Sequence, residues 1–188
     1  GVYTLTVNAA TTITVTMLEI EETNLYALQS PTGTYFNFTE VVPEPNAAKT
    51  YASFQDTPSF LYKVAENNSF GFQSVENEKI FIGYNHGWIV TNDKVEGKWL
   101  WDISEADEDG YVTISRNGDA GNEGGKNLGH DVNTNVGTGI FSNVKNSCNK
   151  WKLLPAYPIT IIYKYNEVEV HREKTAVLAG EYYDIDTQ

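Results

Sequence analysis

The sequence predicts an all-β fold, and three observations support this prediction. The apolar residues alternate with a period of two or form short runs, which is typical of strands rather than of amphipathic helices. Gly, Asn, Asp and Pro interrupt these runs at short intervals. The 188 residues include 12 Tyr, 8 Phe and 4 Trp, and this aromatic load, with abundant Thr and Val, suits pleated, half-buried surfaces. The length allows one medium domain, or one domain with a small partner.

The N-terminal segment predicts a β-hairpin. Residues 3–18 alternate apolar and polar side chains over two stretches, which are joined near residues 8–10. We therefore assign residues 1–22, which precede the repeats described below, to an N-terminal hairpin segment.

A three-fold internal repeat is the most informative feature of the sequence. Each repeat opens with a strand-like segment, continues through a turn-rich stretch with two short strands, and closes with an aromatic or aliphatic segment. The openings lie about 40 to 45 residues apart, which places the first, second and third repeats at about residues 25–68, 69–110 and 111–157. The expected strands are residues 25–30, 34–37, 51–54 and 60–64 in the first repeat, 70–74, 80–84, 88–91 and 99–103 in the second, and 111–116, 126–130, 139–142 and 150–153 in the third.

Three units of four strands are the count of a β-trefoil. In that fold six strands close a small barrel and six form hairpins that cap it, so that apolar residues of all units share one core. A β-sandwich and a propeller give similar cues, although three blades are too few for a usual propeller. We therefore expect a β-trefoil over residues 23–157.

The C-terminal segment predicts a small appended β-module over residues 158–188. Pro155 and Pro158 indicate a break after the third repeat. Residues 159–165 and 168–171 then alternate around a turn at Asn166-Glu167, which is typical of a hairpin, and a further strand is expected at residues 175–178. Residues 1–18, or chain beyond this sequence, would complete the module.

The charge and the cysteine content exclude several classes of partner. The formal net charge is −12, which disfavours nucleic acid and anionic membrane surfaces because phosphate binding needs clustered Lys and Arg. No apolar run is long enough to span a bilayer, so no membrane insertion is expected. Cys148 is the single cysteine, so an intramolecular disulfide is impossible, and we expect a small buried residue rather than a nucleophile.

The three repeats resemble the ricin-type β-trefoil lectin family. The likeness covers about 130 residues at the level of fold, and it is strongest from Phe70 to Pro155. The family's Gln-x-Trp signature has a related form in one repeat and departs from the pattern in two. The residues concerned are Ile82-Gly83-Tyr84 and Leu128-Gly129-His130 in the second strands, and Asn149-Lys150-Trp151, Trp99-Leu100-Trp101 and Phe60-Leu61-Tyr62 at the ends of the repeats.

The resemblance implies a function and a location. The chain is also similar to trefoil segments attached to glycan-processing proteins of gut-type bacteria. We therefore expect a non-catalytic carbohydrate-binding module of a larger secreted or surface protein, whose signal peptide has been removed. Its partners would be a glycan or polysaccharide and the neighbouring domains of the parent chain, outside the cell or on the bacterial surface.

Sugar-binding sites combine an aromatic plate with a few directed amides and carboxylates. In the second repeat, Trp88 is the candidate plate, with Tyr84 and Asn92 beside it. In the third repeat the resemblance implies an acidic residue, an aromatic residue and an amide, for which the nearest matches are Asp119 or Glu123, Phe141 and Asn149, with Asn143 beside them. The alternative is that Trp88 and Phe141 pack the hairpins and the polar residues solvate loops. Trp101 and Trp151 are expected in the core.

Metal, cofactor and catalytic patterns do not fit. Aligning Gly110 with the glycine of an EF-hand loop puts Glu105 first but Arg116 last, where a Glu is required, so residues 107–110 are expected to form a turn. The glycine-rich stretch at residues 121–127 lacks P-loop spacing. His86, His130 and His171 form no His-x-x-x-His pair, and no Gly-x-Ser-x-Gly elbow occurs. We expect no metal, no cofactor and no enzyme activity.

The sequence thus favours a carbohydrate-binding module and leaves one alternative. Because two repeats lack the Gln-x-Trp signature, the chain could instead be a protein-interaction or spacer module with a trefoil fold and no sugar site. Burial of Trp88 and Phe141 would favour that alternative.

Overall fold

The computed structural model describes residues 2–7, 11–17, 24–41, 51–66, 68–85, 88–93, 100–116, 127–131 and 147–183. Within these ranges the chain is all-β with antiparallel pairing, as predicted, and contains no helix. The strands are β1 (Val2–Val7), β2 (Thr11–Met17), β3 (Leu25–Gln29), β4 (Tyr35–Val41), β5 (Tyr51–Gln55), β6 (Leu61–Glu66), β7 (Ser69–Ser74), β8 (Phe81–Asn85), β9 (Trp88–Asn92), β10 (Trp101–Ile103), β11 (Ile114–Arg116), β12 (His130–Asp131), β13 (Ser147–Cys148), β14 (Lys152–Tyr165) and β15 (Val168–Leu178).

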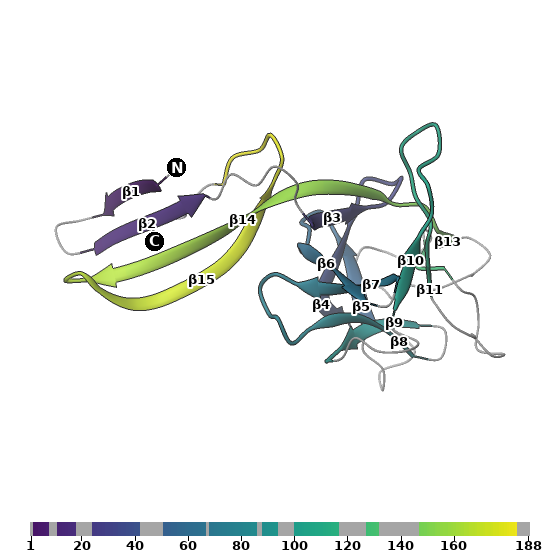
Figure 1. Cartoon of the computed structure of the whole chain (residues 1–188), viewed down its shortest axis with the longest axis horizontal. Coiled ribbons are helices and arrows are strands. Elements are labelled where there is room, and N and C mark those ends of the chain that lie inside the picture. The colour runs from purple at the N-terminus through teal and green to yellow at the C-terminus, as the bar shows by residue number, and fades with distance from the viewer. Residues whose placement is uncertain are drawn as a thin grey trace.

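The long strand β14 belongs to two bodies (Figure 1). Its first residues pair with β3 among the strands of the repeats, and its remainder pairs with β15 and β2. With β1 alongside β2, the second body is a four-stranded antiparallel sheet in the order β1-β2-β14-β15. The N-terminal strands therefore lie against the C-terminal hairpin.

Both terminal hairpins were predicted, and both are confirmed. Strands β1 and β2 pair from Val2–Thr16 to Val7–Thr11. The C-terminal hairpin turns at Asn166 and Glu167, whose φ angles are 47° and 65°. Two consecutive residues with positive φ form the type I′ turn, whose twist matches that of the flanking strands. The separate strand expected at residues 175–178 is instead the end of β15, which continues without interruption from the turn.

The expected break at Pro155 and Pro158 is wrong, because β14 passes through both prolines. The carbonyl of Pro155 accepts a hydrogen bond from Ala179 N at 2.9 Å, so the backbone of Pro155 faces β15. Backbone groups alternate sides along a strand, and the nitrogen of Pro158 therefore faces the opposite side. There the pairing with β3 has ended at Pro155 and that with β2 begins at Ile159, so a missing N–H costs no ladder bond.

The strands of the repeats pair in the order β14-β3-β6-β7-β10-β11. An isolated bridge joins Val112, just before β11, to Trp151, just before β14, with backbone bonds of 2.8 and 2.9 Å in the two directions. Each repeat adds a two-stranded hairpin, formed by β4 and β5, by β8 and β9, and by β12 and β13. The strand expected at residues 139–142 lies outside the described residues.

One apolar core collects residues from all three repeats. Phe54 of the first repeat stacks on Trp151 of the third, with ring centroids 5.2 Å apart. Trp101 and Trp151 are fully buried, which confirms their expected place in the core. The buried members are Leu28, Phe36, Ala52, Phe54, Leu61, Phe72, Ile82, Ile89, Trp101, Ile114, Leu128 and Trp151.

A second apolar cluster fastens the four-stranded sheet to the repeats. It contains Leu25 and Ala27 of β3, Ala176 and Leu178 of β15, and Val75 from the loop after β7. An ion pair between Lys174 of β15 and Glu78 of the same loop lies beside it. The two bodies are therefore packed against each other.

Candidate functional site

The second repeat places three predicted sugar-site residues on one hairpin. Tyr84 lies on β8, and Trp88 and Asn92 lie on β9. The register pairs Asn85 with Trp88, Tyr84 with Ile89 and Phe81 with Asn92. Tyr84 and Trp88 therefore lie near the turn end of the hairpin, whereas Asn92 lies at its other end, and the side chains of all three lie outside what the structure describes. The choice between a sugar plate and a packing role for Trp88 stays a prediction.

The third repeat contributes one described residue to its predicted cluster. Asp119, Glu123, Phe141 and Asn143 lie outside the described residues. Asn149 is exposed, in the short segment between β13 and β14. It immediately precedes Lys150, whose Nζ donates to Asp107 Oδ2 at 2.6 Å.

The acidic stretch around Asp107 forms a turn, as predicted. Asp107 Oδ1 accepts hydrogen bonds from the backbone nitrogens of Asp109 and Tyr111, at 3.1 and 2.9 Å. The hydrogen bond from Lys150, followed by that from the Tyr111 backbone, lowers the pKa of this carboxyl. Its oxygens are therefore engaged in holding the turn. In the described part of the chain, no three His, Cys, Asp or Glu side chains gather in a way that could hold a metal ion.

A pocket of about 500 Å³ opens beside the hairpin of the first repeat. One wall is the β4 strand at residues 37–39, and the facing wall is the loop from Thr57 to Ser59 that leads into β6. Glu76 reaches it from the loop after β7, in the second repeat. The pocket thus lies where the first and second repeats meet.

Four hydrogen bonds fix the two walls of this pocket. Asn37 Nδ2 donates to the carbonyl of Thr57 at 3.1 Å, and Asn37 Oδ1 accepts from Thr39 N at 2.8 Å. The hydroxyl of Ser59 accepts from Phe38 N at 3.0 Å, while Ser59 N donates to the carbonyl of Phe36 at 3.0 Å. Asn37 and Ser59 are buried, so their bonds are shielded from water and hold strand and loop at a set separation.

The groups that remain open to a ligand differ in kind. The ring of Phe38 is half-buried and packs edge-on against Phe36, with centroids 5.1 Å apart. Thr39, Thr57 and Glu76 are exposed. The pocket therefore offers an aromatic ring, two hydroxyls and a carboxylate, which together can contact both an apolar ring face and polar substituents.

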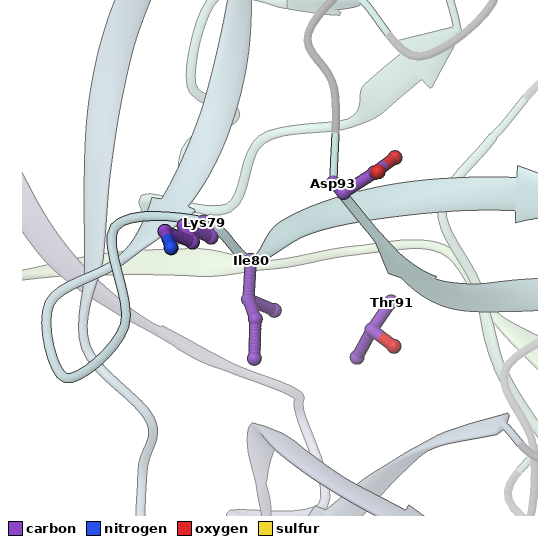
Figure 2. A pocket seen from close by; sticks show the side chains of 4 residues that line it. All are labelled: Lys79, Ile80, Thr91 and Asp93. Carbon is purple, nitrogen blue, oxygen red and sulfur yellow. The ribbon is translucent and has the colours of Figure 1, made fainter.

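A second pocket, of about 310 Å³, lies at the base of the β8–β9 hairpin, next to Asn92 (Figure 2). Ile80 and Thr91 point the same way and form its middle. Lys79 and Asp93 stand on either side, and their charged ends do not converge on one point. This pocket provides fewer convergent groups than the one beside the first hairpin.

Sequence analysis missed the pocket of the first repeat. Its lining residues come from three short segments that lie up to 39 positions apart in the chain, from Asn37 to Glu76. No one of these segments indicates a pocket by itself, because they come together only when β4 pairs with β5 and the adjoining loops pack beside them. The one signal in the sequence was the triplet Asn37-Phe38-Thr39, which places an amide, an aromatic ring and a hydroxyl on consecutive residues of one strand.

Comparison with known proteins gives no match: no family model, no curated protein and no solved structure is significantly similar to this chain. Among the residues that the structure describes, no helix is long and apolar enough to cross a membrane.

Proposed function

We propose that this chain is a non-catalytic carbohydrate-binding module of a larger secreted or surface glycan-processing protein, with a ricin-type β-trefoil over residues 23–157. Four features support the trefoil: the order of the six paired strands, the bridge from Val112 to Trp151, one hairpin in each repeat, and a core shared by all repeats. The four-stranded sheet of the terminal segments is the appended module.

A repeated hydrogen bond also supports the trefoil. The indole Nε1 of Trp101 donates to the carbonyl of Ile82, and that of Trp151 donates to the carbonyl of Leu128. Each tryptophan closes its repeat, and each acceptor lies in or just before the first strand of that repeat's hairpin. Recurrence of a specific side-chain bond at matching positions is expected of internal repeats that share one structure.

The pocket beside the first hairpin is the single observation on which the proposed carbohydrate binding rests. Its volume lies in the range of small-molecule sites, and it combines an aromatic ring with hydroxyls and a carboxylate. The ring of Phe38 suits the apolar face of a sugar, while Thr39 and Glu76 suit its hydroxyls. Since the polar groups Thr39, Thr57 and Glu76 are exposed to solvent, we expect weak binding that positions a neighbouring domain on glycan.

The residues predicted from the sequence belong to the same proposal. Trp88, Tyr84 and Asn92 would form a second contact on the β8–β9 hairpin. Asp119, Glu123, Phe141, Asn143 and Asn149 would form a third contact in the last repeat. Contacts on several repeats would increase the avidity of the module for a polymeric glycan.

A glycan array with the purified chain, followed by titration of each bound oligosaccharide, tests this function. We expect binding that Glu76→Ala lowers, while Glu105→Ala, an exposed carboxylate on the loop after β10, leaves it unchanged. Trp88→Ala and Asn149→Ala test the other two contacts in the same assay. Absence of binding to plant, host and microbial glycans, with a folded chain, would exclude the proposal.

A second candidate function is protein interaction, and one observation favours it. Tyr165, Val168 and Val170 at the tip of the C-terminal hairpin are 56%, 65% and 63% exposed, and exposed apolar groups mark contact surfaces. If the chain acts in this way, Val168→Thr combined with Val170→Thr will weaken its association with an adjoining domain of the parent protein. Isothermal titration calorimetry would measure that association.

A further inference from the structure

The described residues that line the pocket beside the first hairpin include an acidic side chain and no basic one. Of the described residues that line it, Glu76 is the one ionisable side chain, and it is exposed. Asp56, also exposed, directly precedes the lining residue Thr57. No Lys or Arg is among the described lining residues, so the described lining carries a single charge, and that charge is negative.

The surroundings of Glu76 preserve this negative character. Lys174 of the adjoining sheet is held in an ion pair by Glu78, a neighbour of Glu76 in the same loop. The pKa of Tyr183 is raised by burial and by the carboxylates of Glu173 and Glu76. The structure describes no ion pair of Glu76 with any of the residues that it covers, so a bound ligand can supply the counter-charge.

The buried polar side chains of the pocket wall, Asn37 and Ser59, already have hydrogen-bond partners within the protein. Asn37 is hydrogen-bonded to the backbone of Thr57 and of Thr39, and Ser59 is hydrogen-bonded to the backbone of Phe36 and of Phe38. Selectivity among ligands must therefore come from the exposed groups, namely Glu76 and the two threonine hydroxyls, and from the half-buried ring of Phe38. A carboxylate with an aromatic ring nearby favours a cation, because both groups attract positive charge.

We propose that this pocket selects a hydroxylated ring that carries a cationic amine, as in an amino sugar with a free amino group. The inference rests on the proposed carbohydrate-binding function and adds the charge of the ligand. The ammonium group would pair with Glu76, the ring would lie on Phe38, and Thr39 and Thr57 would bond the hydroxyls. An anionic sugar would be repelled by Glu76.

The test is a titration of the full chain with three monosaccharides of different charge, in which NMR spectra recorded below neutral pH measure binding. The probes are D-glucosamine, N-acetyl-D-glucosamine and D-glucuronic acid, which are cationic, neutral and anionic on similar rings. We expect glucosamine to bind about five- to tenfold more tightly than its acetylated form, as for one partly exposed ion pair, and glucuronic acid to bind most weakly.

Substitutions assign the preference to Glu76. Glu76→Gln keeps the size of the side chain and removes its charge, so it should abolish the preference, and glucosamine and N-acetylglucosamine should then bind with similar affinity. Glu105→Gln is the matched control and should change nothing. Added salt should reduce the preference in the wild-type chain, because screening weakens an exposed pair.

The outcomes separate this inference from the proposed function. If N-acetylglucosamine binds as tightly as glucosamine, or if Glu76→Gln retains the preference, carbohydrate binding stands and the amine selectivity is overturned. If neither sugar binds to the folded chain and the glycan array is also empty, the proposed function fails and the inference falls with it.

Discussion

The indole Nε1 of Trp151 donates a hydrogen bond to the carbonyl oxygen of Leu128 at 2.9 Å, and both residues are fully buried. Trp101 makes the corresponding bond to Ile82 at 3.4 Å. In the first repeat Leu61 stands at the corresponding place, because it pairs with Ser74 at the end of β7 as Trp101 pairs with Arg116 at the end of β11. There the carbonyl of Phe36 receives the backbone N–H of Ser59 instead. Each repeat thus satisfies an equivalent buried carbonyl, although only two do so with tryptophan.

Removal of the Trp151 bond should destabilise the chain. Trp151→Phe leaves the carbonyl of Leu128 without its donor in a buried site, which costs about 1–3 kcal/mol, and it also leaves a small cavity. Urea denaturation followed by circular dichroism would measure the loss. Trp101→Phe should cost less because its hydrogen bond is longer. Equal stability of Trp151→Phe and the wild type would show that the bond contributes nothing.

The wall of the first pocket should depend on the amide of Asn37. Asn37→Asp retains an acceptor for Thr39 N but replaces the donor to Thr57 with a carboxylate oxygen facing a carbonyl oxygen. We expect a loss of about 1–3 kcal/mol in the free energy of unfolding, measured in urea, together with weaker sugar binding. Asn77→Asp is the control, since exposed Asn77 accepts from Lys79 N through its Oδ1, and its Nδ2 donates to none of the residues that the structure describes. A comparable loss in both variants would contradict the role of Asn37.

The ion pair of Asp107 with Lys150 should make a small pH-dependent contribution to stability. The pKa of Asp107 is lowered in the folded chain from its ordinary value of 3.8. A lowered folded pKa stabilises the fold above the unfolded value, and this stabilisation is lost as the pH falls through the folded value. Asp107→Asn keeps an oxygen for the backbone bonds of Asp109 and Tyr111 and removes the charge.

Melting temperatures of the wild type and Asp107→Asn, measured across the acid range, would check this dependence. Near neutral pH the wild type should be slightly more stable, because both charges of the pair are exposed. The gap should close as the pH falls below 3.8. A gap that widens toward low pH would rule out the pairing as its cause.

The turn of the C-terminal hairpin should accept glycine with a gain in stability. Glu167 has a φ of 65°, a conformation that glycine adopts without strain and other residues rarely adopt. Glu167→Gly should therefore raise the free energy of unfolding by about 0.5–1 kcal/mol. Thermal denaturation monitored in the near-ultraviolet would detect it.

Gly180 provides the opposite control for this prediction. Its φ is 87°, and an added Cβ would meet nothing within 4 Å, so Gly180→Ala tests backbone strain alone. We expect that variant to be less stable than the wild type. If Glu167→Gly lowers stability, side-chain contacts of Glu167 outweigh the relief of strain.

The sequence by itself determined the local structure. Period-two alternation predicted the strands of the terminal hairpins and of the first two repeats, because one face of each strand packs on a core. Trp101 and Trp151 were predicted in the core, because the aromatic residues that close the repeats were expected to fill one core shared by all three. The Asn166-Glu167 turn and the turn at Asp107 followed from turn chemistry within a few residues.

The tertiary structure alone decided how these pieces combine. Pro155 and Pro158 indicated a break, yet β14 passes both, because the side faced by the nitrogen of Pro158 has no paired neighbour between β3 and β2. The first pocket likewise depends on contacts between Asn37, Ser59 and Glu76, which pairing brings together from separate segments. Strand pairing and the walls of the pocket depend on contacts between residues that are distant in the sequence. Alternation and turn residues predict only the structure of a few neighbouring positions.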